Sequence, residues 1–116
     1  LDDENRQYLS IDYDNVIYAM DEYLFDNFNL ESDIIFVSPL SEYFGDVNGS
    51  SYIGKKMKNP TYLDVVIEAN KAIKMTGDYD HNFLEGINEI KPDKLFDYIG
   101  IKPKKNIRYF EHMLGS

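Results

Sequence analysis

The pattern of apolar and polar positions predicts two amphipathic helices. From residue 13 to residue 28, apolar side chains recur at spacings of three and four, which places them on one face of a helix. The same spacing recurs over residues 60–76, where Asn59 suits the N-cap, Pro60 the first helical position and Gly77 a left-handed stop. We therefore expect two main helices, at 13–28 and 60–76.

Three further segments carry strand patterns, and one carries a short helical pattern. Residues 33–38 are a β-branched and aromatic run, and residues 106–114 alternate apolar side chains on both faces, as buried strands do. Residues 81–90 fit either a strand or a helix, and Gly86 favours the strand because glycine weakens a helix interior. Residues 92–99 begin with proline and are followed by glycine, as in a short helix.

Together these elements predict one two-layer α+β domain over residues 1–116. Its sheet is expected to be small and mostly antiparallel, and to pack against the two main helices, with a short helix near residues 92–99. Residues 1–9 are polar and are expected to be flexible. Apolar residues make up 43% of the chain and aromatic residues 15%, which is enough to form a core.

Composition limits the chemistry and the compartment. The absence of cysteine excludes disulfides, thiolate nucleophiles and cysteine-based zinc sites. No apolar run is long enough to cross a membrane, so we expect a soluble chain with no membrane partner and, by default, a cytoplasmic one. Because the chain begins at Leu1 rather than Met, a removed targeting segment would leave export undecided. Abundant Lys, Ile, Asn and Tyr indicate an AT-rich genome.

Charge divides the chain into two unlike halves. Residues 1–50 carry twelve acidic residues and one basic residue, whereas residues 51–116 carry nine acidic and eleven basic residues, which gives −11 and +2 and the total of −9. Such an acidic field opposes direct binding of nucleic acid and favours a basic protein surface as partner. Acidic side chains equally serve solubility, so charge alone does not establish a partner.

An unusual aromatic and acidic face follows from the first predicted helix. Tyr18 and Phe25 lie on the same side as Asp21, Glu22 and Asp26. Either a sheet or loop covers these aromatic rings, or the five side chains form a contact patch for a basic partner.

The densest group of candidate catalytic or metal-binding residues lies in residues 76–86, TGDYDHNFLEG. Asp78, Asp80 and His81 are candidate ligands for a divalent metal, and the carboxylates would make His81 a general base. Glu85 can join them only if residues 81–90 are helical, because in a strand it would stand about 13 Å from His81. Polar residues after a helix stop are also ordinary turn residues. No other cofactor is expected.

Residues 49–56, GSSYIGKK, come close to the phosphate-binding loop pattern G-x-x-x-x-G-K-[ST]. Lys56 occupies the position where Ser or Thr would ligate magnesium, and the following helix begins too late to point at a phosphate. What is left is a looser anion site made of Gly54, Lys55 and Lys56.

Three functional hypotheses from different classes follow. The first, which the charge pattern favours, is a small acidic binding module, such as an inhibitor or immunity-type protein, that docks a basic partner. The second is a metal-dependent or acid/base hydrolase that uses Asp78, Asp80 and His81. The third is a ligand-binding or homo-oligomeric accessory domain, suggested by the aromatic content and by a last strand that is apolar on both faces.

Overall fold

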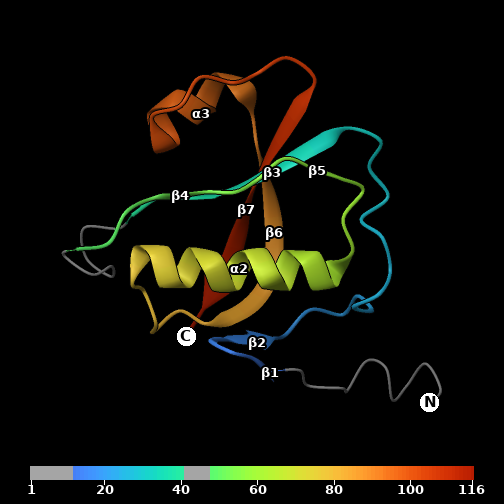
Figure 1. The fold of residues 1–116 in the computed structure, drawn as a ribbon, viewed down its shortest axis with the longest axis vertical. Coiled ribbons are helices and arrows are strands. Elements are labelled where there is room, and N and C mark those ends of the chain that lie inside the picture. The colour runs from blue at the N-terminus through green and yellow to red at the C-terminus, as the bar shows by residue number, and fades with distance from the viewer. Residues whose placement is uncertain (1–11, 41–47) are drawn as a thin grey trace.

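In a computed structural model, residues 12–40 and 48–116 are described, and they form seven strands and two helices (Figure 1). The strands are β1 (Asp12–Tyr13), β2 (Val16–Tyr18), β3 (Asp33–Ser38), β4 (Tyr52–Ile53), β5 (Met57–Lys58), β6 (Phe83–Ile90) and β7 (Ile107–Gly115). The helices are α2 (Tyr62–Thr76) and α3 (Pro92–Ile99). The expected flexibility of residues 1–9 lies outside the described residues.

All seven strands belong to one mixed sheet. Its order is β1-β2-β6-β7-β3-β4, with β5 also paired to β3. Strands β2 and β6 are parallel, as are β3 and β7, and the other pairs are antiparallel. The prediction of a small, mostly antiparallel sheet is therefore wrong. It missed the parallel pairs because they join segments far apart in the chain, such as Ile17 with Phe83, which no local pattern reveals.

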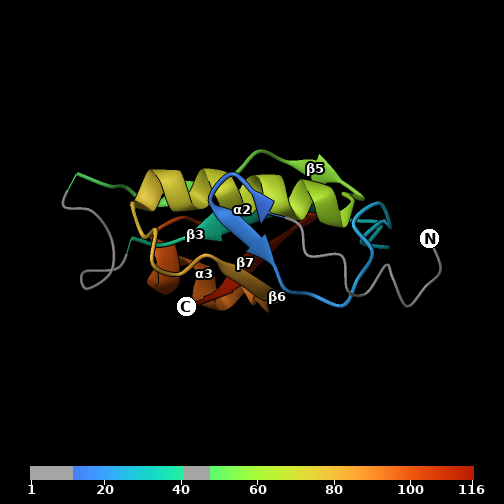
Figure 2. The same ribbon diagram turned by 90° about the horizontal axis from the view of Figure 1, so that it is seen from below.

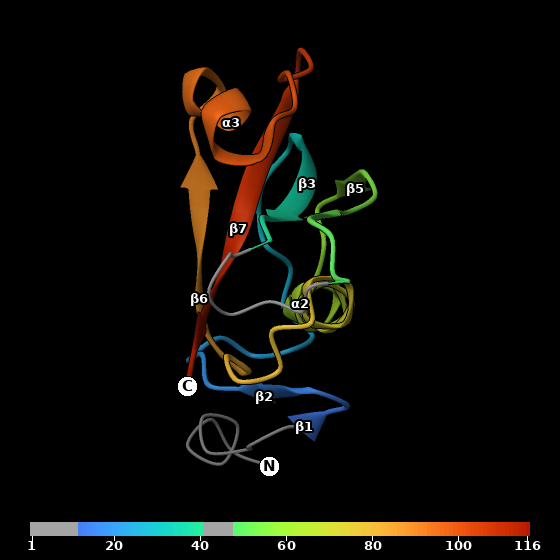
Figure 3. The same ribbon diagram turned by 90° about the vertical axis from the view of Figure 1, so that its left-hand side faces the viewer.

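The sheet curls around α2. This helix contacts β1 and β2 at one edge of the sheet, and β3 and β4 at the other edge. Figure 3 views α2 nearly end-on, with β1 and β2 below it, β6 and β7 to its left and β3 above. A twisted sheet with one helix in its concave face forms a half-barrel around a single apolar core.

Helix α3 covers the opposite face, so the predicted two-layer arrangement is also wrong. Alternation along β3 directs Ile34 and Phe36 into the core with α2, and Ile35 and Val37 into a second cluster with Leu95 of α3. Figure 2 shows α2 and α3 on opposite sides of β3 and β7. The two-sided burial expected for the last strand is found at Tyr109 and Phe110 of β7, which belong to the two different clusters, whereas Met113 is 51% exposed.

The predicted helix at 13–28 is not formed. Strands β1 and β2 make a hairpin through a two-residue turn in which Asp14 has φ 51°, a left-handed conformation that aspartate tolerates but an α-helix excludes. Val16 and Tyr18 are buried with the strand period of two. Residues 19–32 form the loop that follows. The segment is rich in β-branched, aromatic, Asn and Asp residues, which favour strands and turns and outweigh the helical spacing. Of the two main helices expected, only α2 is present.

The other local predictions are confirmed, with boundaries shifted by one or two residues in α2, β6 and β7. Residues 83–90 are a strand and not a helix, and α3 begins at Pro92. Helix α2 ends at Gly77 with φ 78°, but its N-cap is Thr61 and not Asn59. Thr61 and Asp64 exchange side-chain and backbone hydrogen bonds in a capping box, which fixes the start of the helix. Neither helix of the described chain has the length and apolarity needed to cross a bilayer.

Candidate functional site

The loop of residues 19–32 is attached to the N-terminal end of α2. The backbone amides of Tyr62 and Leu63 donate to the carbonyls of Asp26, at 3.1 Å, and Leu24, at 2.8 Å. The first amides of a helix have no partner within the helix, so the loop satisfies two of them. The loop conformation and the helix start therefore stabilise each other.

Two buried side chains anchor the same loop from below. Leu24 lies in the core against α2, with 5% of its surface exposed. Tyr18 is 7% exposed, and its hydroxyl donates to the carbonyl of Glu22 at 2.6 Å. Burial raises the pKa of Tyr18, and the charge of Glu22 raises it further. Tyr18, predicted to contact a partner, thus lies beneath the acidic residues and supports them.

The outer side of the loop exposes the four other predicted binding residues. Phe25 is 63% exposed, and its ring packs edge-on against Tyr23 with a centroid distance of 5.6 Å. Asp21, Glu22 and Asp26, within four positions of Phe25 in the chain, are also exposed, and no basic residue occurs between positions 12 and 33. We call the exposed surface of Asp21, Glu22, Phe25 and Asp26 the Phe25 surface.

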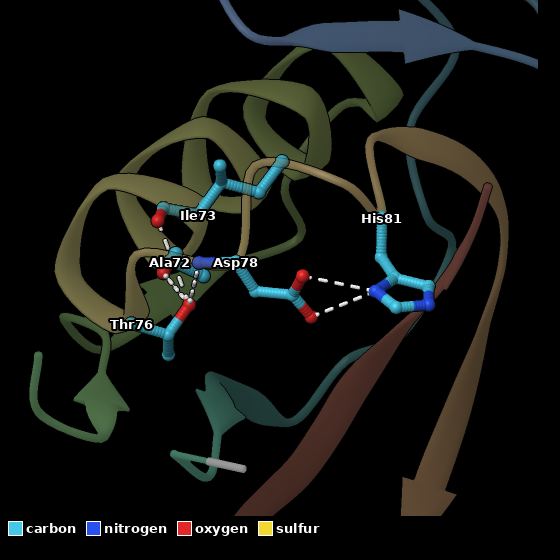
Figure 4. A network of polar contacts seen from close by, with 5 residues as sticks. All are labelled: Ala72, Ile73, Thr76, Asp78 and His81. Carbon is cyan, nitrogen blue, oxygen red and sulfur yellow. Dashed lines mark hydrogen bonds and ion pairs between the residues drawn. The ribbon is translucent and has the colours of Figure 1, made fainter. Parts of the chain in front are cut away.

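The turn at the opposite end of α2 brings Asp78 and His81 together. Both oxygens of the Asp78 carboxylate lie within hydrogen-bond distance of Nδ1 of His81, at 2.9 and 3.0 Å (Figure 4). The side chains are 23% and 28% exposed. The turn is held by Thr76, whose hydroxyl donates to the carbonyl of Ala72 at 2.9 Å. A carboxylate on Nδ1 orients the ring and leaves Nε2 to face other groups.

Asp78 and His81 line a cleft of about 260 Å³ between this turn and strands β3 and β7. Its other polar side chains come from Ser38, Thr76, Tyr98, Glu111 and His112, and the remaining lining residues are Pro39, Ala72, Ile73 and Leu114. We call it the α2 C-terminal cleft. Asp78 and His81, two of the candidate site residues predicted in this turn, therefore lie at a concave surface.

His112 belongs to the inner wall of this cleft. Its ring stacks on Phe36 with a centroid distance of 4.7 Å, and Nε2 lies 3.1 Å from the carbonyl of Val65. Because a carbonyl only accepts, Nε2 carries the hydrogen and Nδ1 has the lone pair. This buried Nδ1 has no hydrogen-bond partner among the described residues. Burial lowers the pKa of His112 to about 4, although the bond to Val65 acts in the opposite direction, so the ring is neutral at neutral pH.

Asp80 and Glu85 do not line the cleft. Both are exposed, and Glu85 lies at an irregularity in the pairing of β6 with β7. Within residues 12–40 and 48–116, no three acidic or histidine side chains converge closely enough to ligate a metal ion. The roles of His81 as a general base and of Asp78, Asp80 and His81 as metal ligands stay predictions.

Two of the three residues of the predicted anion site, Gly54 and Lys56, contact other groups. The amide of Gly54 donates to the carbonyl of Phe36 at 2.8 Å, and Lys56 lies 3.9 Å from Asp33. Lys55 is exposed. A side chain at position 54 would meet the carboxylate of Glu68. The segment is therefore packed around a carboxylate, and the anion site stays a prediction.

Two side-chain pairs near the predicted sites were not foreseen from the sequence, because each pair joins distant segments of the chain. Tyr98 of α3 donates to Glu111 of β7, and both line the cleft. Burial raises the pKa of Tyr98, as does this hydrogen bond. Glu68, predicted on the polar side of its helix, is 1% exposed and accepts from Tyr52 at 2.8 Å. No local signal identifies such pairs, because their partners are 13 and 16 positions away.

Comparisons with known proteins assign no family to the chain. No family model, curated protein or solved structure matches it. Function is therefore inferred from the Phe25 surface and the α2 C-terminal cleft.

Proposed function

We propose that the chain is a small acidic binding module that docks a basic protein through the Phe25 surface. The observation that carries this proposal is the 63% exposure of Phe25 on a loop that is otherwise anchored to the core and to α2. Aromatic side chains are enriched among the residues that dominate binding energy at protein interfaces. An exposed aromatic ring surrounded by polar groups is typical of such a centre.

The attachment of the loop favours binding with little rearrangement. Leu24 and Asp26, the two neighbours of Phe25, have their carbonyls hydrogen-bonded to α2. The backbone on both sides of the ring is thereby fixed before a partner arrives. Association then requires less ordering of the interface, which leaves more of the contact energy for affinity.

Charge indicates the kind of partner. Asp21, Glu22 and Asp26 are exposed within four positions of Phe25 in the chain, and no basic residue in the same segment offsets their negative field. Such a field increases the association rate of a positively charged surface and weakens as salt is added. An inhibitor or immunity-type protein that covers a basic functional surface would need this combination.

Affinity capture with matched variants tests the proposal. The tagged chain is incubated with extract of its source cells, and bound proteins are compared for wild type, Phe25→Ala and Phe96→Ala. Phe96 is 58% exposed on α3, so its removal is a control for the loss of an exposed phenylalanine. The charge test compares Asp21→Asn/Glu22→Gln/Asp26→Asn with Asp80→Asn/Asp93→Asn/Asp97→Asn, which removes three charges from other exposed positions.

We expect a basic protein that is retained by wild type, by Phe96→Ala and by the distant charge variant. It should be lost with Phe25→Ala, lost with the loop charge variant, and released by salt. Equal retention by Phe25→Ala and Phe96→Ala would contradict the proposal, as would a partner that depends only on total charge.

A further inference from the structure

We infer that Asn48 is a site of spontaneous covalent modification, at which the side-chain amide is converted to a carboxylate through a cyclic imide. The reaction requires that the backbone nitrogen of the next residue reach the side-chain carbonyl carbon of the asparagine. Asn48 is followed by Gly49, and none of the other nine asparagines of the chain precedes a glycine. Asn48 belongs neither to the Phe25 surface nor to the lining of the α2 C-terminal cleft, so the inference does not rest on the proposed function.

The modification consists of two steps. In the first, the backbone nitrogen of Gly49 loses its proton and attacks Cγ of Asn48. A bond from this nitrogen to Cγ forms, the bond from Cγ to Nδ2 breaks, and Nδ2 leaves as ammonia with the proton that Gly49 gave up. In the second, water opens the five-membered ring at one of its two carbonyl carbons and leaves aspartate or isoaspartate at position 48. One water is consumed and one ammonia released, with no oxidant or cofactor.

Glycine favours the first step for a steric reason. Gly49 has no Cβ beside the attacking nitrogen, and its backbone adopts conformations that other residues avoid. A larger residue in this position crowds the nitrogen and slows the attack. Asn59 cannot react in this way at all, because the next residue is Pro60, which has no N–H.

The fold leaves the attacking nitrogen of Gly49 available. Among the described residues, the amide of Gly49 donates to no group. The amide that follows Asn27 belongs to Phe28 and donates to the carbonyl of Pro60 at 2.7 Å. Asn70 lies within α2, where the next amide is hydrogen-bonded along the helix. Such an amide must give up its hydrogen bond before its nitrogen can attack, and Gly49 is spared that step.

The reacting pair lies next to a fixed part of the fold. Asn48 is exposed, so water and hydroxide reach its side chain. Two residues later, the amide of Ser50 donates to the carbonyl of Met75 at 2.9 Å, near the C-terminal end of α2. The product adds one negative charge close to the negative end of the helix dipole and takes the net charge of the chain from −9 to −10. Isoaspartate also lengthens the main chain by one carbon atom just before the anchored Ser50.

Peptide mapping by mass spectrometry tests the inference on the folded chain. The chain is incubated at mildly acidic and at mildly alkaline pH, and samples are digested at intervals. We expect a mass gain equal to the exchange of NH₂ for OH, confined to the peptide that contains Asn48. The gain should be faster at alkaline pH, because the nitrogen of Gly49 must lose its proton before it attacks.

An isoaspartyl methyltransferase supplied with S-adenosylmethionine identifies the route. It methylates isoaspartate and not aspartate, and only the cyclic imide opens to both products. Direct hydrolysis of the side-chain amide would give aspartate alone. We therefore expect the modified chain to accept methyl groups and the freshly purified chain to accept few.

Two variants separate the role of the glycine from the exposure of the segment. Gly49→Ala should slow the mass gain about ten-fold or more, because the added Cβ hinders the attack. This variant should fold normally, since the glycines of the described chain with positive φ are Gly77 and Gly100. Asn48→Gln keeps a side-chain amide but would need a six-membered ring, and it should show little gain over the same period. A dispersed ¹H–¹⁵N spectrum confirms that each variant is folded.

The same incubation in guanidinium chloride supplies the comparison with the unfolded chain. The inference is overturned if the folded chain gains no mass at Asn48, whether or not the unfolded chain does. It is also overturned if another asparagine of the folded chain reacts as fast, if Gly49→Ala reacts at the wild-type rate, or if the product contains no isoaspartate.

Discussion

The two ends of α2 are completed in opposite ways. At the N-terminal end, Thr61 and Asp64 form a capping box, and carbonyls from the loop of residues 19–32 accept two further amide hydrogens. At the C-terminal end, a single left-handed residue, Gly77, stops the helix, and the chain turns away over a hollow. One end is thus closed by the loop and the other opens into a cleft.

This difference explains what each end can offer to a partner. At the closed end, Phe25 and its acidic neighbours are exposed on a loop whose backbone is hydrogen-bonded to α2. The open end brings polar side chains from four segments of the chain around a concave space, and one buried acceptor, Nδ1 of His112, is left without a partner among the described residues. Exposed aromatic side chains on a prearranged backbone suit protein partners, and concave surfaces with converging polar groups suit small ones.

The largest expected effect tests whether the N-terminal end is closed by the loop. Leu24→Ala removes a side chain that is 5% exposed and should lower the free energy of unfolding by about 3 kcal/mol. Phe25→Ala, at the next position, should change it by less than about 0.5 kcal/mol because that ring is largely exposed. Urea unfolding followed by circular dichroism measures both. Similar values for the two variants would mean that the loop is not anchored through Leu24.

The next largest expected effect is a pH dependence of stability caused by His112, the buried histidine at the C-terminal end of α2. The pKa of His112 is lowered from 6.5 to about 4, so between these values the unfolded chain binds more protons than the folded one. Its contribution to stability is therefore fully present above about pH 6.5 and is lost as the pH falls toward 4, with a total of up to roughly 3 kcal/mol.

Denaturant unfolding at a series of pH values measures this dependence. His112→Phe keeps a ring stacked on Phe36 and should flatten the stability profile between pH 6.5 and 4. His81→Gln, which removes the other histidine of the cleft, should leave most of the slope in place. If His81→Gln flattens the profile and His112→Phe does not, His112 is not the buried group that resists protonation.

The same comparison shows which features the sequence could predict. Helix α2 and its stop at Gly77, helix α3 from Pro92 and the strand at 33–38 all follow from local signals, namely turn residues and apolar runs whose period and length agree. The segment at 13–28 has no such agreement, since its helical spacing competes with strand-forming and turn-forming residues. In the structure its first part pairs with a distant segment, Ile17 with Phe83, and no local pattern reveals that contact.

The candidate sites divide in the same way. Asp78 and His81 were predictable as neighbours because one turn carries both. Glu111 and His112 reach the cleft only because β7 runs between β6 and β3, and the sequence alone does not contain that strand order. Four of the five residues predicted on the first helix are still exposed together, although on a loop, because they lie within six consecutive positions of the chain.

The smallest expected effects compare the two helix ends directly. Gly77→Ala places a Cβ at φ 78° and should lower the free energy of unfolding by about 1–2 kcal/mol. Gly77→Asn should lower it less, because asparagine tolerates this conformation.

Thr61→Ala should lower the free energy of unfolding by about 1 kcal/mol or less, since it leaves only the amide of Asp64 unsatisfied, while the amides of Tyr62 and Leu63 keep their partners in the loop. Thr61→Ser is the matched control and should behave like wild type. Urea unfolding of the four variants under one set of conditions gives the comparison. A larger loss for Thr61→Ala than for Gly77→Ala would mean that the loop does not support the N-terminal end, and that the rigidity assigned to the Phe25 surface has another origin.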